Sequence, residues 1–321
     1  MIKYQNYDCT LENVVEKLQT DGIAVLPNIL SPTEVEATQQ GMWDMLEYVS
    51  KEWENPIKKD VPESWNGFYQ LLPFHSMMIQ SFGLSHSQYI WNIRQNEKVV
   101  EAFAKIWNCS KEELITSFDG LSIHLPPETT GKGWFKELKW LHVDQSYLQN
   151  DFECAQGFVS AWDIEEGDAS FTFLDNSHRY HKEFKNRFDA QKTSDWHRLN
   201  EEELKFYADK GCENKAVKCS AGSLVLWDSR LVYSGMAAHK ERKNPKIRHV
   251  IYVCQTERKR CSKDILQKRI NAFENMETTN HWPHKATIFE KDRHSKNKEL
   301  PVLQPIPTPV LSDLGEKLVG Y

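Results

Sequence analysis

The 321-residue sequence lacks any apolar run near the roughly 20 residues that a membrane helix requires. It also lacks a strong excess of one charge, because 40 basic and 46 acidic residues leave a net charge of −6. That balance argues against general nucleic-acid binding. With only 14 glycines and 13 prolines, the chain is neither collagen-like nor of low complexity. At 40% hydrophobic and 12% aromatic residues, it has ample material for a folded core.

Cysteine is present, but without the spacing of a disulfide framework or a zinc site. The cysteines stand at positions 9, 109, 154, 212, 219, 254 and 261. Their number is odd and no pair is spaced as C-x-x-C. The first ten residues, MIKYQNYDCT, also lack the apolar core of a signal peptide. We therefore expect reduced thiols and an intracellular, cytoplasmic protein.

The N-terminal third has mostly helical periodicity. Residues 11–20 and 96–108 place apolar side chains at helical spacing. Residues 22–30 predict a short strand, and Ser31 with Glu34 forms a capping-box pattern that predicts a helix to about residue 53. Residues 55–90 are aromatic-rich and follow neither a helical nor a strand period, and the role of segment 65–91 stays open.

From about residue 117 the pattern changes to short β-prone runs. These runs are SFDGLSIHLPP, QGFVSAWDI, ASFTFLDN, KAVKCS, SLVLWDS and RHVIYVCQ. Helical spacing returns at 201–210 and 262–275. Many short strands preceded by helices indicate a sandwich or barrel backed by a helical layer. We expect one domain over 1–321. It is divided into a mostly helical layer (1–115), a β core (116–260), and a C-terminal helix with an extended tail (261–321).

The sharpest local motif is His142-Val143-Asp144. Residues two apart on a strand point to the same face, so the imidazole and the carboxylate can offer a nitrogen and an oxygen to one divalent metal. Taken alone, H-x-D is also compatible with a histidine at a strand end followed by a solvated aspartate.

A second motif, AGSLVLWDSRLVYSG, spans residues 221–235 and reads as a glycine turn, a buried strand and a second strand that carries Tyr233. Farther on, Arg248 opens the strand-like run RHVIYVC and shares a face with Val250 and Tyr252. A guanidinium on such an apolar face requires a partner. The carboxylate of a small ligand or a protein Asp or Glu would each satisfy it.

In combination, these motifs resemble the phytanoyl-CoA dioxygenase-like branch of the Fe(II)/2-oxoglutarate oxygenases. The family order is H-x-D, a strand pair around an N-G/P-G-S-H-type turn, a G-[DS]-[LV]-x-[LF]-W-D-S-R-x-x-H segment and a distal arginine. It recurs here as His142-Val143-Asp144, the segment 166–178, Gly222–Arg230 and Arg248. The resemblance covers roughly residues 65–260. It implies a double-stranded β-helix (a jelly roll, cupin-like), mainly β with α, with an N-terminal helical layer.

The resemblance also implies cofactors and roles for particular residues. His142 and Asp144 match the first two metal ligands, and Arg248 matches the residue that grips the distal carboxylate of 2-oxoglutarate. Trp162 matches an aromatic beside the cosubstrate, and Ser234 falls next to a hydroxyl position of the family. Fe(II), 2-oxoglutarate and O₂ would be the cofactors and cosubstrates.

The third metal ligand is where this sequence departs from the family, because Tyr233 stands where the family has histidine. A tyrosine ligates as phenolate, and the ordinary phenol pKa is near 10. Three interpretations remain open. Tyr233 ligates in an altered oxidative site, or His239 enters as the third ligand, or the site binds metal weakly or not at all.

Weaker candidates complete the set. Gln145 and Gln156 are candidates for the substrate side, although polar residues at strand ends often only bond the backbone. The His281-Trp-Pro-His284 segment suits a loop better than a zinc site. Arg94 and Asp119 suit a buried pair that supports the sheet.

The sequence therefore predicts a 2-oxoglutarate-dependent non-haem iron oxygenase that hydroxylates or oxidises a small or tethered organic substrate, with succinate and CO₂ as coproducts. The alternative is a catalytically impaired pseudo-oxygenase that binds 2-oxoglutarate or metal. The sequence predicts neither a membrane partner nor an oligomeric state.

Overall fold

Two mainly antiparallel sheets form the centre of the molecule. The computed structural model describes residues 2–72, 78–131, 140–190, 195–289 and 300–321. Within these ranges, the strands form two six-stranded sheets and one two-stranded sheet. The strands of the first large sheet are, in order, β1 (Lys3–Gln5), β10 (Asn214–Val217), β8 (Ser170–Leu174), β12 (Tyr233–Met236), β6 (His142–Val143) and β9 (His197–Arg198).

The second large sheet combines strands from the N-terminal part of the chain with strands from the later β-rich part. Its order is β2 (Ile23–Leu26), β11 (Leu224–Asp228), β7 (Ala155–Ser160), β13 (Arg248–Val253), β5 (Leu121–His124) and β3 (Met78–Ile79). The small sheet pairs β14 (Gln255–Glu257) with β4 (Leu114–Thr116). Strands β1, β2 and β3 come from the N-terminal part of the chain, so that part contributes to the sheets as well as to the helices.

Aromatic side chains from both large sheets pack against one another and fill the space between them. Phe171 of β8 lies 4.7 Å from Trp227 of β11, centroid to centroid, and Phe158 of β7 lies 6.0 Å from the same indole. Inward and outward side chains alternate along each strand. This double-stranded β-helix is the fold that the sequence predicted.

The helices occupy both outer faces. They are α1 (Val14–Asp21), α2 (Pro32–Val49), α3 (Gln88–Arg94), α4 (Glu97–Trp107), α5 (Pro127–Thr130), α6 (His181–Phe188), α7 (Glu201–Asp209), α8 (Lys263–Glu274) and α9 (Asp313–Val319). The predicted capping box starts α2: the Ser31 hydroxyl accepts from the Glu34 amide, and the Glu34 carboxylate accepts from the Ser31 amide. Asn200 and Glu203 form the same motif at α7.

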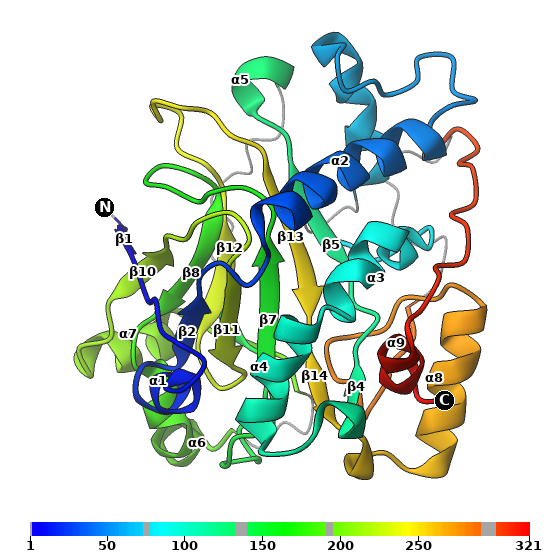
Figure 1. Cartoon of the computed structure of the whole chain (residues 1–321). Helices are drawn as coiled ribbons and strands as arrows, with labels where there is room; N and C mark the ends of the chain where they lie inside the picture. The colour runs from blue at the N-terminus through cyan, green and yellow to red at the C-terminus, as the bar shows by residue number, and fades with distance from the viewer. Residues whose placement is uncertain (1, 73–77, 132–139, 191–194, 290–299) are drawn as a thin grey trace.

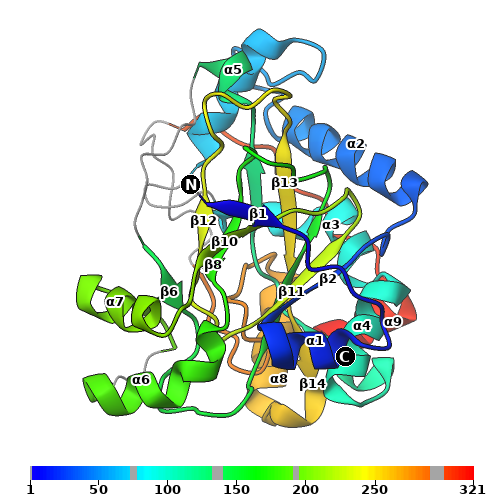
Figure 2. The same ribbon diagram turned by 90° about the vertical axis from the view of Figure 1, so that its left-hand side faces the viewer.

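The helical layer covers the outer face of the second sheet. Figure 1 shows α2, α3 and α4 lying across β7 and β13, and their apolar side chains share one cluster with Leu226, Ile251 and Val253 of that sheet. On the opposite side of the molecule, α6 and α7 pack through Phe184 and Tyr207 (Figure 2). Among the helices in the described ranges, none is long and apolar enough to cross a membrane.

Candidate active site

Strand pairing brings the His-Asp motif and Tyr233 together. Strand β6 pairs with β12 so that His142 lies directly opposite Tyr233, and the two ring centroids are 4.4 Å apart. Asp144 follows β6, and its amide donates to the Ser229 carbonyl at 3.3 Å. His142 and Asp144 are 5% and 7% exposed. Residues 89 positions apart therefore form one buried polar group.

Hydrogen bonds hold this group in a form that suits a metal. His142 Nδ1 lies 3.0 Å from the Trp140 carbonyl, which can only accept, so Nδ1 carries the proton. The Nε2 lone pair is then free, 3.7 Å from Asp144 Oδ1. A backbone acceptor behind the imidazole is the usual support of a metal-ligating histidine. His142 and Asp144 thus fit as two ligands of one divalent ion.

Tyr233 binds the other oxygen of the same carboxylate. Its hydroxyl donates to Asp144 Oδ2, which also accepts from Gln156 Nε2 at 3.1 Å. Burial, and then the Asp144 charge, raises the pKa of Tyr233 well above its ordinary value. The phenol is therefore a neutral hydrogen-bond donor in this arrangement, and it would have to lose its proton before it could bind a metal.

The electrostatics of Asp144 point to a further histidine. Burial alone raises the pKa of the Asp144 carboxyl. His281, His142 and the hydrogen bond from Tyr233 oppose that effect and bring the pKa below its ordinary value. His281 is the largest of these opposing influences.

Arg248 lies on the inner face of the second sheet and lacks an acidic partner. The residue is 6% exposed, and its guanidinium lies 5.7 Å from the Phe158 ring centroid. Burial lowers the pKa of Arg248, which the neighbouring Tyr252 hydroxyl opposes. Within the described part of the chain, Arg248 forms no salt bridge with an Asp or Glu, its leading polar neighbour is Tyr252, and its Nε has no hydrogen-bond partner. A buried cation in this state fits a ligand carboxylate, the first of the two options left by the sequence.

Of the remaining predicted residues, Gln156 belongs to this group and Gln145 serves another purpose. The Gln145 amide donates to the carbonyls of Gln149 and Asp151 at 2.8 and 2.7 Å, and its oxygen accepts from the Ser229 hydroxyl at 2.7 Å. Gln145 thus fixes the loop after Asp144 and has little hydrogen-bonding capacity left for a substrate.

Trp162, Ser234 and His239 do not join His142 and Asp144. Trp162 packs with the cluster beneath the helical layer, 6.4 Å from the His249 ring. Ser234 follows Tyr233 on β12, so its side chain points to the opposite face of the sheet.

The alternative third ligand needs a correction, because His239 lies elsewhere. Its amide donates to the Gly167 carbonyl at 2.8 Å, and its ring lies 6.1 Å from that of Tyr4. Strand β12 continues to Met236 without turning back, so the chain carries His239 beyond the metal-ligand candidates.

Sequence reasoning assigned structural roles to Asp119 and His281, and both act electrostatically on this group, His281 on Asp144 and Asp119 on Tyr233. Arg94 and Asp119 are both buried, and the Arg94 guanidinium donates to the Asp119 backbone carbonyl rather than to its carboxylate. That carboxylate instead accepts from the Gly120 amide at 2.7 Å and from Gln80 at 3.2 Å. His281 is the leading opposite charge on both Asp119 and Asp144. A lone S-F-D-G or H-W-P-H segment gives no local signal of this convergence.

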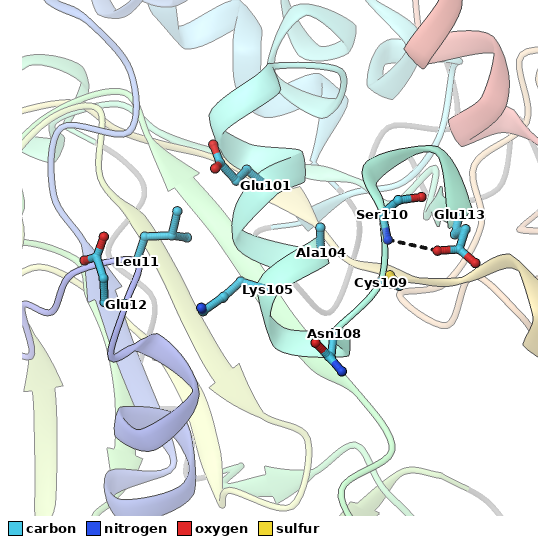
Figure 3. A pocket seen from close by; sticks show the side chains of 9 residues that line it. All are labelled: Leu11, Glu12, Glu101, Ala104, Lys105, Asn108, Cys109, Ser110 and Glu113. Atoms are coloured by element: carbon cyan, nitrogen blue, oxygen red, sulfur yellow. Dashed lines mark hydrogen bonds between the residues drawn. The ribbon is translucent and has the colours of Figure 1, made fainter.

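The described residues nevertheless form no complete metal cluster. No three of their His, Cys, Asp or Glu side chains are grouped closely enough to hold an ion together. Figure 3 shows a separate surface hollow beside α4, where Glu101 and Lys105 line one side and Leu11 and Glu12 the other. It contains none of the residues discussed above.

Comparisons with known proteins identify the family. The family model of the phytanoyl-CoA dioxygenases matches residues 18–250. Ava biosynthesis cluster protein O from Aspergillus versicolor is 25% identical over 281 residues, which are 84% of this chain and 85% of that protein.

Solved structures support the fold. The hypothetical protein JW0805 from Escherichia coli, determined at high pH, is 12% identical with a TM-score of 0.63, covering 98% of this chain and 85% of its own. The epimerase SnoN, in complex with Fe³⁺, alpha ketoglutarate and nogalamycin RO, is 12% identical with a TM-score of 0.50, covering 77% of this chain and 83% of its own. The family match includes His142, Asp144 and Arg248. The chain belongs to the phytanoyl-CoA dioxygenase family of Fe(II)- and 2-oxoglutarate-dependent oxygenases.

Proposed function

We propose that the protein hydroxylates or otherwise oxidises a small or tethered organic substrate, while 2-oxoglutarate is converted to succinate and CO₂. His142 and Asp144 would hold Fe(II), and Arg248 would bind the distal carboxylate of 2-oxoglutarate. The observation that carries this proposal is a buried imidazole–carboxylate pair and a buried arginine without an acidic partner, both in one jelly roll.

The bound metal supplies the oxidising chemistry when 2-oxoglutarate and O₂ are present. The chain's own contribution is to hold groups in place and limit water. Gln156 and the Trp140 carbonyl fix the carboxylate and the imidazole, respectively. Phe158 forms an apolar surface beneath Arg248, where a charge-assisted pair with a ligand is stronger than in water.

Gln156 is the residue that we propose for the substrate side. It lies on β7 next to Asp144, and one hydrogen of its amide is already donated to Asp144 Oδ2. The remaining amide hydrogen and the amide oxygen can position a hydroxyl or carbonyl of the substrate beside the metal. Trp162 and Ser234 stay proposals for the cosubstrate side.

The test is an anaerobic titration of the protein with Fe(II) and then 2-oxoglutarate, followed by visible absorption. We expect a weak charge-transfer band only when both are present, because 2-oxoglutarate then chelates the metal. Arg248→Ala should weaken the 2-oxoglutarate dependence of this band at least about tenfold, since a charge-assisted hydrogen bond contributes about 1.5–3 kcal/mol. Lys246→Ala, a charge removal two residues away in the preceding loop, is the matched control.

Other outcomes would change the proposal. A strong phenolate-to-Fe(III) band on admission of air would show that Tyr233 ligates the metal. Absence of any band with wild-type protein would reject the oxygenase and leave a binding protein. If Arg248→Ala bound 2-oxoglutarate as tightly as wild type, the cosubstrate assignment would be wrong.

A further inference from the structure

An exposed tryptophan lies beside the buried His142–Asp144 pair. Trp196 is 48% exposed, and its ring centroid is 6.1 Å from that of the buried His142 imidazole. Trp140 is partly exposed, and its ring centroid lies 4.9 Å from the same imidazole. Two indoles that water reaches therefore lie around an imidazole that is almost completely buried.

Strand pairing accounts for the position of Trp196. Strand β9 pairs with β6 so that His197 lies opposite Val143 and Arg198 opposite His142. Trp196 directly precedes β9, just as Asp144 directly follows β6, so the two residues come next in the same register. The ring contact with His142 places the indole on the face of the sheet that carries the proposed metal ligands. A substrate has to approach the metal from that face.

The residues on either side of Trp196 are tied to other parts of the fold. Asp195 forms an ion pair with Lys285, whose ammonium lies 3.8 Å from the Trp282 ring centroid. His197 is buried, and its Nε2 lies 3.0 Å from Glu203 Oε1 at the start of α7. A single exposed apolar residue is ordinary on a protein surface. This one is held between two tethered neighbours in ring contact with a proposed metal ligand, which gives it a place at the entrance of the site.

The chemistry of the two indoles favours a flat, uncharged ring as their ligand. An aliphatic chain gains only the burial of apolar surface there, whereas an aromatic ring gains the ring contact as well. Arg198 disfavours a cationic ring, because residues two apart along an extended chain point to the same side and its positive charge therefore lies on the side of Trp196.

We propose that Trp196, together with Trp140, forms an aromatic rim of the site on which an uncharged planar aromatic ring of the substrate stacks. This inference rests on the proposed function and names the substrate class of that site. Trp140 also holds His142 Nδ1 through its carbonyl, so its substitution would disturb a proposed metal ligand. Trp196 makes no such bond to His142 and is the residue that tests the rim.

The first test is isothermal titration calorimetry of the full-length, metal-free protein with 2-naphthol and with decahydro-2-naphthol. The saturated compound has the same skeleton and hydroxyl group but no aromatic face. We expect wild type to bind 2-naphthol about two- to tenfold more tightly than decahydro-2-naphthol, because only the aromatic compound forms ring contacts.

Variants of Trp196 separate ring contact from apolar area. Trp196→Leu keeps an apolar side chain and should bind 2-naphthol and decahydro-2-naphthol equally. Trp196→Phe keeps an aromatic ring and should retain the preference, with 2-naphthol affinity within about threefold of wild type. Tyr48→Leu, which removes an exposed aromatic side chain from α2, is the matched control and should bind both compounds like wild type.

A second readout locates the bound ring on the folded protein. Fluorine NMR of protein labelled with 5-fluorotryptophan gives a Trp196 resonance, which is identified by its loss in Trp196→Phe. This resonance should shift on addition of 2-naphthol and stay in place on addition of decahydro-2-naphthol at the same concentration. Because the shift is measured on the wild-type sequence, it holds even if a Trp196 variant is unfolded.

The proposal is overturned if wild type binds neither compound or binds both equally, if Trp196→Leu keeps the preference for 2-naphthol, or if the Trp196 resonance does not move. These titrations contain no metal, so they differ from failure of the proposed function. Absence of the charge-transfer band together with an intact preference for 2-naphthol would reject the oxygenase and leave a protein that binds aromatic rings. A normal band without that preference would reject only the aromatic rim.

Discussion

At the scale of single residues, Asp144 shows how one carboxylate interacts with three neighbours. One oxygen faces His142 Nε2, and the other accepts from Tyr233 and Gln156. If Asp144 binds the metal as proposed, exchange of the family's histidine for tyrosine replaces a metal ligand by a hydrogen-bond donor to a ligand. The phenol reaches the carboxylate because β6 and β12 pair at that position.

Buried histidines outside the site predict a pH dependence of stability. His181 donates from Nε2 to the Ser146 carbonyl at 3.1 Å and stacks on Tyr147, and burial lowers its pKa to about 4. The folded state thus favours neutral imidazole. The unfolded chain, with a pKa near 6.5, takes up a proton first as the pH falls. Stability is then complete above about pH 6.5 and declines as the pH falls toward 4.

We expect His181→Gln to remove part of this decline. Between pH 7.5 and 5, wild type should lose on the order of 2 kcal/mol of unfolding free energy through His181. The variant should lose correspondingly less in urea-unfolding experiments at the two pH values. His239→Gln, in the loop beside Gly167, is the control and should follow wild type. Equal slopes in His181→Gln and wild type would show that His181 is not held neutral by burial.

At the scale of elements, the loop after β6 decides where the Asp144 carboxylate points. The loop returns to β7 and is tied together from inside by the fully buried Gln145. A short strand followed by an internally bonded loop holds a side chain more firmly than a free loop does. Asp144 is thereby held between strand β6, which precedes it, and the loop that Gln145 ties together.

We predict that Gln145→Ala lowers the unfolding free energy by about 2–3 kcal/mol, because it leaves buried carbonyls and the Ser229 hydroxyl without partners. Urea unfolding would measure this loss. Gln149→Ala, on the exposed side of the same loop, should cost less than about 0.5 kcal/mol. If Gln145→Ala left stability unchanged and only weakened substrate binding, Gln145 would be a substrate residue, as its position in the sequence suggested.

At the scale of the whole molecule, both ends of the chain are joined to the jelly roll. Strands β1 and β2 extend the two sheets, with β2 paired along β11. The C-terminal helix α9 is held through Arg269, whose guanidinium donates to the carbonyls of Thr116, Pro283, Leu318 and Val319. On this basis we propose that residues 1–321 fold as one domain.

Arg269 offers a test of that unity. Burial lowers the pKa of Arg269 to about 10. The side chain is fully buried together with the carbonyls to which it donates. Arg269→Met should lower the unfolding free energy by about 3 kcal/mol or more, because several buried carbonyls lose their donor at once. Thermal unfolding should remain a single transition at lower temperature. Arg258→Met, which loses bonds only to the carbonyls of Gly320 and Tyr321, should cost less than about 1 kcal/mol. Two separated transitions in the Arg269 variant would contradict the single domain.

Local patterns were sufficient for most of the elements. The Ser31–Glu34 capping box, the amphipathic run at 201–210 and the alternation in RHVIYVC depend on neighbours in the chain, and α2, α7 and β13 formed as predicted. Residues 55–90 follow neither period, and the described parts of this range fold as short helical turns, β3 and the start of α3. Their conformations depend on packing against the sheet and α2, which no local periodicity records.

The sequence by itself determined the order of the motifs and the family, and it singled out His142, Asp144 and Arg248 as candidate site residues. Only the tertiary structure decided which distant side chains stand beside them. Strand register placed the Tyr233 hydroxyl on Asp144, and the continuation of β12 carried His239 to the turn at Gly167. The physical reason is that spacing along a chain constrains neighbours within a few residues, whereas contacts across sheets are set by pairing and packing of the whole fold.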